Sequence, residues 1–78
     1  IEIYNTGGYT STLEVTNGTL VNAASGTLVV NNTYGYLKAQ LNNQGTITSN
    51  SGFKLEKPGA AHQNSGTIVV NSDVTIEQ

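Results

Sequence analysis

Acidic side chains are the candidates for chemistry in this sequence. There are five of them: Glu2, Glu14, Glu56, Asp73 and Glu77. Glu56 and Glu77 occupy equivalent positions in two similar segments, "GTITSNSGFKLEK" and "GTIVVNSDVTIEQ". If these segments are successive coils of one repeat, the two carboxylates lie one coil apart on the same outer face, near the ~5 Å separation of a retaining glycosidase pair. Lys54 and Lys57 lie nearby and no aromatic groove accompanies the acids, so we expect a solvated outer face of mixed charge.

The single histidine, His62, lies in the segment "PGAAHQNSG", which contains the only proline. One histidine and no cysteine cannot supply a multidentate metal site. A lone histidine in a loop is usually a surface residue, and we expect His62 to be one. The loop itself is a candidate for recognition, because a rigid scaffold holds it in place. The sequence thus predicts no catalytic, cofactor-binding or metal-ligating residue.

Few residues of this chain carry charge. Charged residues make up 10% of the 78 residues, against roughly a quarter in ordinary globular domains, and the net charge is −2. This composition predicts no nucleic-acid partner. No apolar run approaches the ~20 residues of a membrane-spanning helix, so we expect no membrane insertion. The sequence shows no signal peptide and begins with Ile1, and we therefore expect a chain that is processed or cut from a longer one.

An internal repeat organises the chain. The tripeptide Gly-Thr-Leu/Ile begins at residues 18, 26, 45 and 66, and the last three are spaced 19 and 21 residues apart. A gapless alignment gives five columns: Leu28, Ile47 and Ile68; Val30, Ser49 and Val70; Asn31, Asn50 and Asn71; Tyr34, Phe53 and Val74; Tyr36, Leu55 and Ile76. Leu13 and Val15 fit the last two of these columns. A further apolar column follows later in each repeat, and it contains Leu20, Leu41 and Ala60. The alignment therefore predicts that Tyr34 and Tyr36 fill the interior or its edge.

The alternation of apolar and polar residues predicts short strands with one buried face, joined at corners of Asn, Gly and Ser. A unit of about 20 residues cannot bury that face alone, but copies stacked at ~4.8 Å spacing can. We therefore expect an all-β fold, a parallel β-solenoid of about four coils of roughly 20 residues, with right-handed connections. Residues 1–78 are expected to form a single segment, either part of a longer solenoid or a subunit that stacks end to end.

The asparagine column has a predicted role at the corners. Asn tolerates the left-handed backbone conformation, and its side-chain amide can bond an identical amide in the next coil. We expect such a ladder in the column of Asn31, Asn50 and Asn71. Replacing Asn50 by Leu should accordingly weaken assembly more than replacing Asn43.

The coil pattern xxGTI/LxxN covers residues 18–78 and resembles the repeats of filamentous-haemagglutinin-type secreted proteins and of autotransporter passenger domains. The resemblance implies a right-handed β-helix that belongs to an extracellular or cell-surface protein of bacteria. It carries over no catalytic residue and no cofactor. Phage tailspikes and fibres use similar coils.

A non-enzymatic structural or adhesive function follows from this interpretation, as a stalk, an adhesin shaft or a self-assembling filament. The ends of a solenoid are rows of unpaired backbone groups, and the sequence shows no polar cap to cover them. We therefore expect a homo-oligomer formed by end-to-end stacking, or continuation of the same chain, with a surface glycan or a host protein as a further partner. The alternative is a tailspike-like fragment that binds or cleaves surface polysaccharide.

Overall fold

Strands account for most of the described chain. The computed structural model describes residues 1–5 and 9–77. Within those residues there is no helix, and the strands are β1 (Glu2–Tyr4), β2 (Thr10–Asn22), β3 (Thr27–Asn31), β4 (Tyr34–Asn43), β5 (Thr46–Ser49), β6 (Phe53–Glu56), β7 (Gln63–Asn64), β8 (Thr67–Val70) and β9 (Val74–Glu77). Thr, Val, Ile and Tyr favour extended backbone, while the Asn, Gly and Ser residues between the strands favour tight corners.

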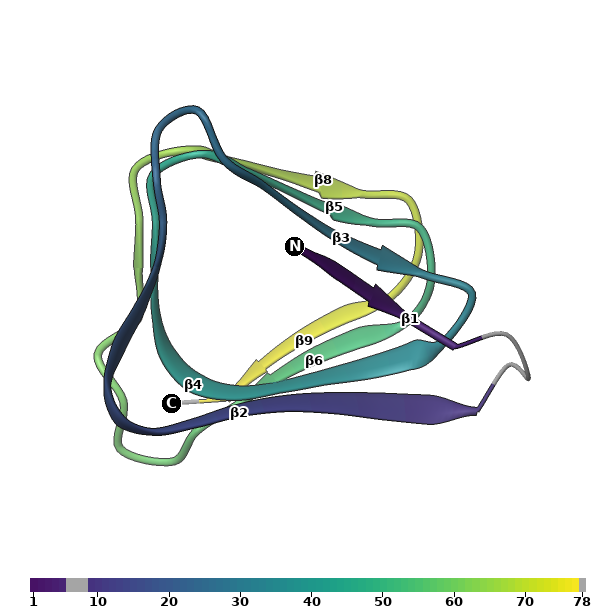
Figure 1. Cartoon of the computed structure of the whole chain (residues 1–78), viewed down its shortest axis with the longest axis horizontal. Coiled ribbons are helices and arrows are strands. Elements are labelled where there is room, and N and C mark those ends of the chain that lie inside the picture. Colours follow the sequence, from purple (N-terminus) through teal and green to yellow (C-terminus); the bar gives the residue numbers. More distant parts are fainter. Residues whose placement is uncertain (6–8, 78) are drawn as a thin grey trace.

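The strands stack into a three-sided parallel β-solenoid (Figure 1). One side has the order β1-β3-β5-β8, and a second has the order β2-β4-β6-β9. The later halves of β2 and β4, together with β7, form the third side. All pairings are parallel, as expected from the repeat. The chain completes three turns and then adds β8 and β9, which are two sides of the next turn. We expected about four coils, and the structure has three full turns and one partial turn.

The apolar columns meet inside the solenoid. Leu28 pairs with Ile47 and Ile47 with Ile68, and the neighbouring column of Val30, Ser49 and Val70 pairs in the same way. Both columns were predicted from the repeat and are confirmed. Alternate residues of each strand face inward, so the buried apolar residues form one cluster: Ile3, Leu28, Val30, Leu37, Ala39, Leu41, Ile47, Phe53 and Leu55. The interior is therefore a stack of short apolar rows along the solenoid axis.

One corner contains an extra residue that the gapless alignment missed. Between the pairs Val30–Ser49 and Gly35–Phe53, the second coil has one residue more than the third. Asn32 lies in this corner and has a φ of 54°, the only positive φ among the described residues other than glycine. The left-handed conformation expected at the corners therefore occurs at Asn32 and not in the column of Asn31, Asn50 and Asn71.

The extra residue places two tyrosines on the outside. A slip of one residue turns every following side chain to the opposite face of a strand. Gly35 and Leu37, and not Tyr34 and Tyr36, take the inward positions of β4. Tyr34 is 38% exposed and its ring packs against that of Tyr36, with ring centroids 5.2 Å apart. The prediction that these tyrosines fill the interior or its edge, in the columns of Phe53 and Leu55, is wrong, because Gly35 and Leu37 occupy those columns.

Two other columns differ from the alignment. Leu13 pairs with Leu37 and so belongs to the column of Leu55, one inward position later than expected, although it still packs against the core. Leu20 pairs with Leu41, as predicted. In the next coil Gln63 pairs with Asn42, so the residue beside Leu41 is His62. The column therefore continues at His62, whereas the alignment had placed Ala60 there.

Candidate functional site: a charged face, an amide ladder and two open ends

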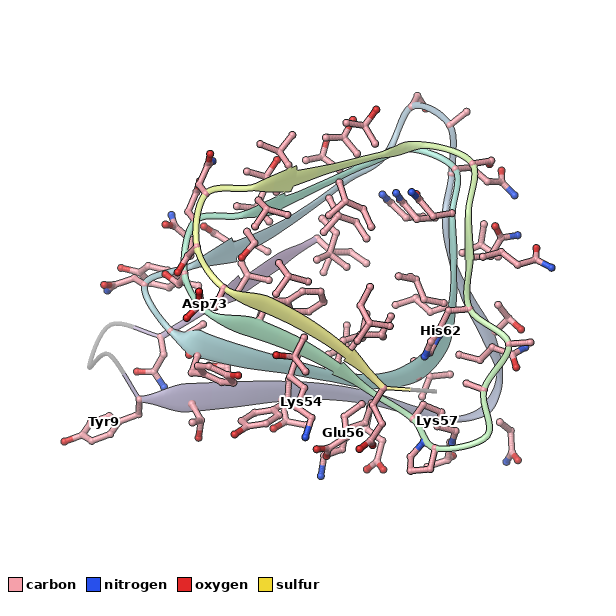
Figure 2. The ribbon with its side chains drawn as sticks, turned by 180° about the vertical axis from the view of Figure 1, so that it is seen from behind. Tyr9, Lys54, Glu56, Lys57, His62 and Asp73 are labelled. Carbon is pink, nitrogen blue, oxygen red and sulfur yellow. The ribbon has the colours of Figure 1, made fainter. Side chains whose placement is uncertain are left out.

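The two carboxylates singled out in the sequence lie in register on the outer face. Glu56 pairs with Glu77 across β6 and β9, as the alignment predicted. Lys54 Nζ lies 2.9 Å from one Glu56 oxygen, and Lys38 Nζ lies 3.6 Å from the other. Figure 2 shows Lys54 and Glu56 together outside the ribbon. The expected outer face of mixed charge is thus present as a small ion-pair cluster.

The ion pairs shift the pKa of the Glu56 carboxyl downward, in the direction opposite to the one that a general acid requires. A hydrogen bond from Lys54, reinforced by the charges of Lys54 and Lys38, lowers the pKa of the Glu56 carboxyl although desolvation opposes this. The same hydrogen bond and the charge of Glu56 raise the pKa of Lys54. A glycosidase general acid requires a raised carboxyl pKa. The geometry of Glu56 therefore favours a structural ion pair.

His62 links two coils and is not the plain surface residue that the sequence predicted. Its Nδ1 accepts a hydrogen bond from the backbone N–H of Leu41 at 3.1 Å, and its Nε2 lies 2.9 Å from the carbonyl oxygen of Glu77. Because Nδ1 accepts a hydrogen bond, the proton of the neutral ring is on Nε2, which donates to Glu77. The imidazole is half-buried and holds the Pro-containing loop against β4.

A buried asparagine ladder runs along the third side, and sequence reasoning missed it. Asn22 Nδ2 donates to Asn43 Oδ1, and Asn43 Nδ2 donates to Asn64 Oδ1, each at 2.8 Å. Asn22 also donates to the carbonyl of Thr46, and Asn43 to that of Thr67, so each amide fixes the corner of the following coil. Asn43 is 0% exposed. The ladder therefore satisfies polar groups in the interior, where an unpaired amide would be costly.

The ladder has a direction. Each amide nitrogen points toward the C-terminal coil, and each amide oxygen points toward the N-terminal coil. The two ends of the row consequently differ, with a donor at Asn64 and an acceptor at Asn22.

The asparagine column predicted from the sequence is weaker and lies on the surface. Asn71 Nδ2 donates to Asn50 Oδ1 at 3.0 Å, which confirms one step of the ladder. Asn31 instead donates to a Glu2 carboxylate oxygen at 3.4 Å. Asn50 is exposed and Asn43 is buried, so for the stability of the single chain we expect the Asn43 side chain to matter more than that of Asn50.

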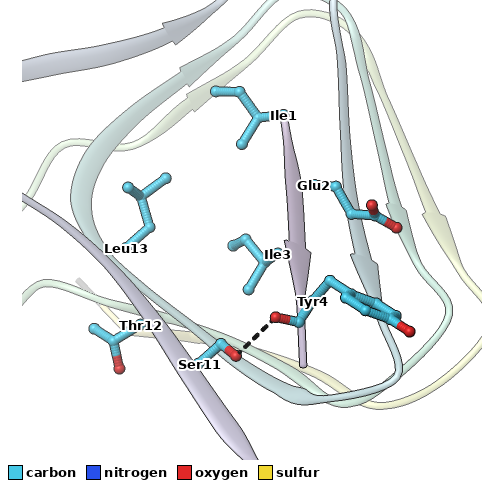
Figure 3. Close-up of a pocket in the computed structure, with 7 residues that line it drawn as sticks. All are labelled: Ile1, Glu2, Ile3, Tyr4, Ser11, Thr12 and Leu13. Carbon is cyan, nitrogen blue, oxygen red and sulfur yellow. Dashed lines mark hydrogen bonds between the residues drawn. The ribbon is translucent and has the colours of Figure 1, made fainter. Parts of the chain in front are cut away.

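The N-terminal end of the solenoid is an open edge. The outer edges of β1 and β2 have no further strand beside them in the described part of the chain. Ile1 is in register with Leu28 and so belongs to the column of Leu28, Ile47 and Ile68, and it is 62% exposed at this end. Figure 3 shows the hollow that opens there, whose volume is about 220 Å³ and whose walls come from β1 and from the Ser11–Leu13 part of β2. Ser11 Oγ donates to the carbonyl of Tyr4 across it at 3.3 Å.

The C-terminal end is open in the same way. Val70 and Ile76 continue inward-facing columns of β8 and β9, yet they are 60% and 53% exposed because no described coil covers them. A second hollow of about 200 Å³ lies here, lined by Leu41, Leu55, His62, Gln63, Asn64, Ile68 and Ile76. The two ends therefore present apolar columns and unpaired strand edges that have the same spacing.

Other kinds of site are not seen in residues 1–5 and 9–77. These residues form no group of three or more His, Asp or Glu side chains that could hold a metal ion. They also include no helix that is long and apolar enough to cross a membrane. No protein-family model, no curated protein and no solved structure matches this chain.

Proposed function

We propose that this chain is a non-enzymatic structural segment of a secreted or surface-exposed protein, and that it builds a stiff rod by stacking solenoid coils end to end. The observation that carries the proposal is the pair of open parallel edges, β1 and β2 at one end and β8 and β9 at the other. Each added coil lengthens such a rod by ~4.8 Å. A stalk, an adhesin shaft or a filament would use this stiffness.

The columns of the structure define how a second copy stacks. If the parallel register continues, β1 of the next copy lies on β8, with its Ile1 over Ile68 and its Ile3 over Val70. On the next side, its Leu13 lies over Ile76. The exposed apolar side chains of each end are then buried against apolar partners. A contact of this head-to-tail kind does not close and therefore yields a filament.

The outer charges oppose this contact at low salt. Glu14 pairs with Lys38, and Lys38 forms an ion pair with Glu56, so signs alternate in the first three coils. In the stacked arrangement Glu77 faces Glu14 of the next copy, which places like charges together. Because salt screens exposed charges, we expect stacking to strengthen as ionic strength rises. Glu77→Lys should restore the alternation and favour stacking at low salt.

Sedimentation velocity and electron microscopy at rising protein concentration test the proposal. We expect rods whose length increases with concentration and with salt. Val70→Lys places a charge on the inward face of the β8 edge and should leave the chain monomeric. Val69→Lys is the matched control, because the neighbouring valine faces outward and should tolerate the charge. A chain that stays monomeric throughout, or two variants that assemble equally, would contradict end-to-end stacking.

A further inference from the structure

One corner of the first coil is longer than the corresponding corner of the next coil. The register of β2 with β4 shifts between Glu14 and Thr19. At this shift, four residues of β2 stand opposite the single residue Ala39 of β4, and they are Val15, Thr16, Asn17 and Gly18. In Figure 1 the corner of β2 accordingly lies outside that of β4. The bulge therefore follows from the number of residues within this coil.

The bulge presents the pair Asn17-Gly18 to solvent. Val15 still packs against the core, whereas the residues from Thr16 to Gly18 are exposed. Gly18 has a φ of 84°, and a Cβ at this residue would meet no atom within 4 Å. Within residues 1–5 and 9–77, no hydrogen bond holds the side-chain amide of Asn17. The amide can therefore turn toward the peptide nitrogen of Gly18.

An asparagine followed by a glycine can undergo a reaction that needs no enzyme. The backbone nitrogen of the glycine loses its proton to solvent base and attacks the side-chain carbonyl carbon, Cγ. A Cγ–N bond forms, the Cγ–Nδ2 bond breaks, and ammonia leaves, which produces a five-membered succinimide ring. Water then opens the ring at Cγ to give aspartate, or at the backbone carbonyl to give isoaspartate. Glycine favours the attack because it has no Cβ beside its nitrogen and its backbone rotates most freely.

The other asparagines are poorer candidates for this reaction. The chain contains one Asn-Gly pair. Three other asparagines are followed by a backbone N–H that donates to a carbonyl of the preceding coil: Gln44 after Asn43 at 2.8 Å, Ser51 after Asn50 at 3.3 Å, and Ser65 after Asn64 at 2.9 Å. The buried ladder also holds the Asn43 amide on both sides. These residues must open locally before they can react, which lowers their rate by the free energy of opening.

We propose that Asn17 is a site of spontaneous modification, at which the folded chain converts the asparagine amide to aspartate and isoaspartate through attack by the Gly18 nitrogen. Water is consumed, ammonia is released, and nothing is oxidised or reduced. The product makes the net charge of −2 one unit more negative. Isoaspartate also adds one carbon to the backbone, and the bulge can absorb it because its residues have no partner in the register with β4.

Incubation of the folded full chain in mildly alkaline buffer made with oxygen-18 water, followed by peptide mapping by mass spectrometry, tests the proposal. We expect one oxygen-18 atom to enter at Asn17, and a more acidic species to appear on anion exchange. The same chain unfolded in guanidinium chloride gives each asparagine its own reference rate. Asn17 should react at nearly the same rate in both states, whereas folding should slow Asn43 by at least about thirtyfold, the factor that its two ladder bonds supply.

Two variants test the chemistry at this position. Gly18→Ala hinders the attacking nitrogen and should lose most of the conversion at Asn17, while Asn17→Gln cannot form the five-membered ring and should stay unmodified there. Circular dichroism checks that both variants fold, and the map of the unsubstituted chain decides the proposal if Gly18→Ala does not.

The modified chain should differ in Tm from the unmodified chain by less than about 4 °C, as expected for a change at an exposed bulge. Three results would overturn the proposal: no label at Asn17 in the folded chain, a rate at Asn17 that folding slows as much as it slows Asn43, or unchanged conversion in folded Gly18→Ala.

Discussion

Removal of the Asn43 side chain is expected to destabilise the solenoid strongly. Asn43 is fully buried, donates to Asn64 Oδ1 and accepts from Asn22 Nδ2, both at 2.8 Å. Longer bonds of 3.3 Å connect its Nδ2 to the carbonyls of Gly45 and Thr67. Asn43→Ala deletes this whole set at the centre of the ladder.

The magnitude follows from the number of bonds and their burial. Two ladder bonds at about 1 kcal/mol each, plus about 1 kcal/mol for interior groups left without a partner, give a loss of about 3 kcal/mol. Asn50→Ala is the control, because it removes one exposed bond to Asn71 that water can replace, and it should cost less than about 1 kcal/mol. A domain of this size shifts in Tm by about 4–8 °C per kcal/mol, so the two variants should differ by more than about 8 °C.

Urea and thermal unfolding followed by circular dichroism measure both variants. A third variant, Asn43→Asp, keeps the shape and replaces the donor with oxygen. Burial among carbonyl oxygens should raise the folded-state pKa of the new carboxyl above its unfolded value, so this variant should be most stable in acid and lose stability as pH rises through that pKa. Equal losses for Asn43→Ala and Asn50→Ala would refute the assignment of the ladder as the main polar support of the interior.

Three further predictions concern the corner glycine, the ion-pair cluster and the histidine. Gly66→Ala should lower the free energy of unfolding in urea by more than about 3 kcal/mol, because the new Cβ would meet the Gly45 carbonyl oxygen. Gly59→Ala is the control: its Cβ would have open space, but its φ of +76° is strained for alanine, so it should cost about 1–2 kcal/mol. Similar costs for the two variants would contradict the stacked corner. The ion pair with Lys54 lowers the pKa of the Glu56 carboxyl in the folded chain, so it stabilises the fold above the ordinary Glu range and loses this effect as pH falls through the lowered folded pKa. Glu56→Gln should therefore lower the Tm at neutral pH, and this Tm difference should shrink in acid and in high salt. A Tm difference that stays constant would argue against the ion pair. In the neutral form of the His62 imidazole, nitrogen-15 NMR should find the proton on Nε2, and a proton on Nδ1 would contradict the hydrogen bond that Nδ1 accepts from the Leu41 N–H.

The parallel fold could be predicted from the repeated corner residues and from the aligned apolar columns of the sequence. The repeated Gly-Thr followed by Leu28, Ile47 and Ile68 was enough to predict parallel stacking, because these positions recur at nearly constant spacing and alternate with polar residues. The pairing of Glu56 with Glu77 followed from the same spacing. These predictions succeeded where the corners have equal length.

The tyrosines were misplaced because one corner has a different length. In the segment from Tyr34 to Leu41, apolar residues occur on both faces, so Tyr34 and Tyr36 fit an inward pattern as well as Leu37 and Ala39 do. A gapless alignment cannot separate these choices, since a shift of one residue exchanges the two faces. The longer run of Leu37, Ala39 and Leu41 was the signal that favoured the correct face.

The buried ladder was missed for a related reason. Asn43 and Asn64 both stand two residues before a Gly-Thr, which was a usable signal. Asn22 stands four residues before Gly26, so the first member did not fit the same spacing. The role of His62 depended on the register of Asn64, and therefore could not be assigned before the ladder was known.

Nuclear Overhauser spectroscopy of the labelled Val70→Lys variant, which is expected to remain monomeric, tests the parallel stacking of the repeats most directly. Successive coils should give methyl contacts from Leu28 to Ile47 and from Ile47 to Ile68, together with the offset pairing of Leu37 with Leu55. Strong Hα–Hα contacts between these segments, as antiparallel strands give, or an absence of the methyl contacts, would contradict the solenoid.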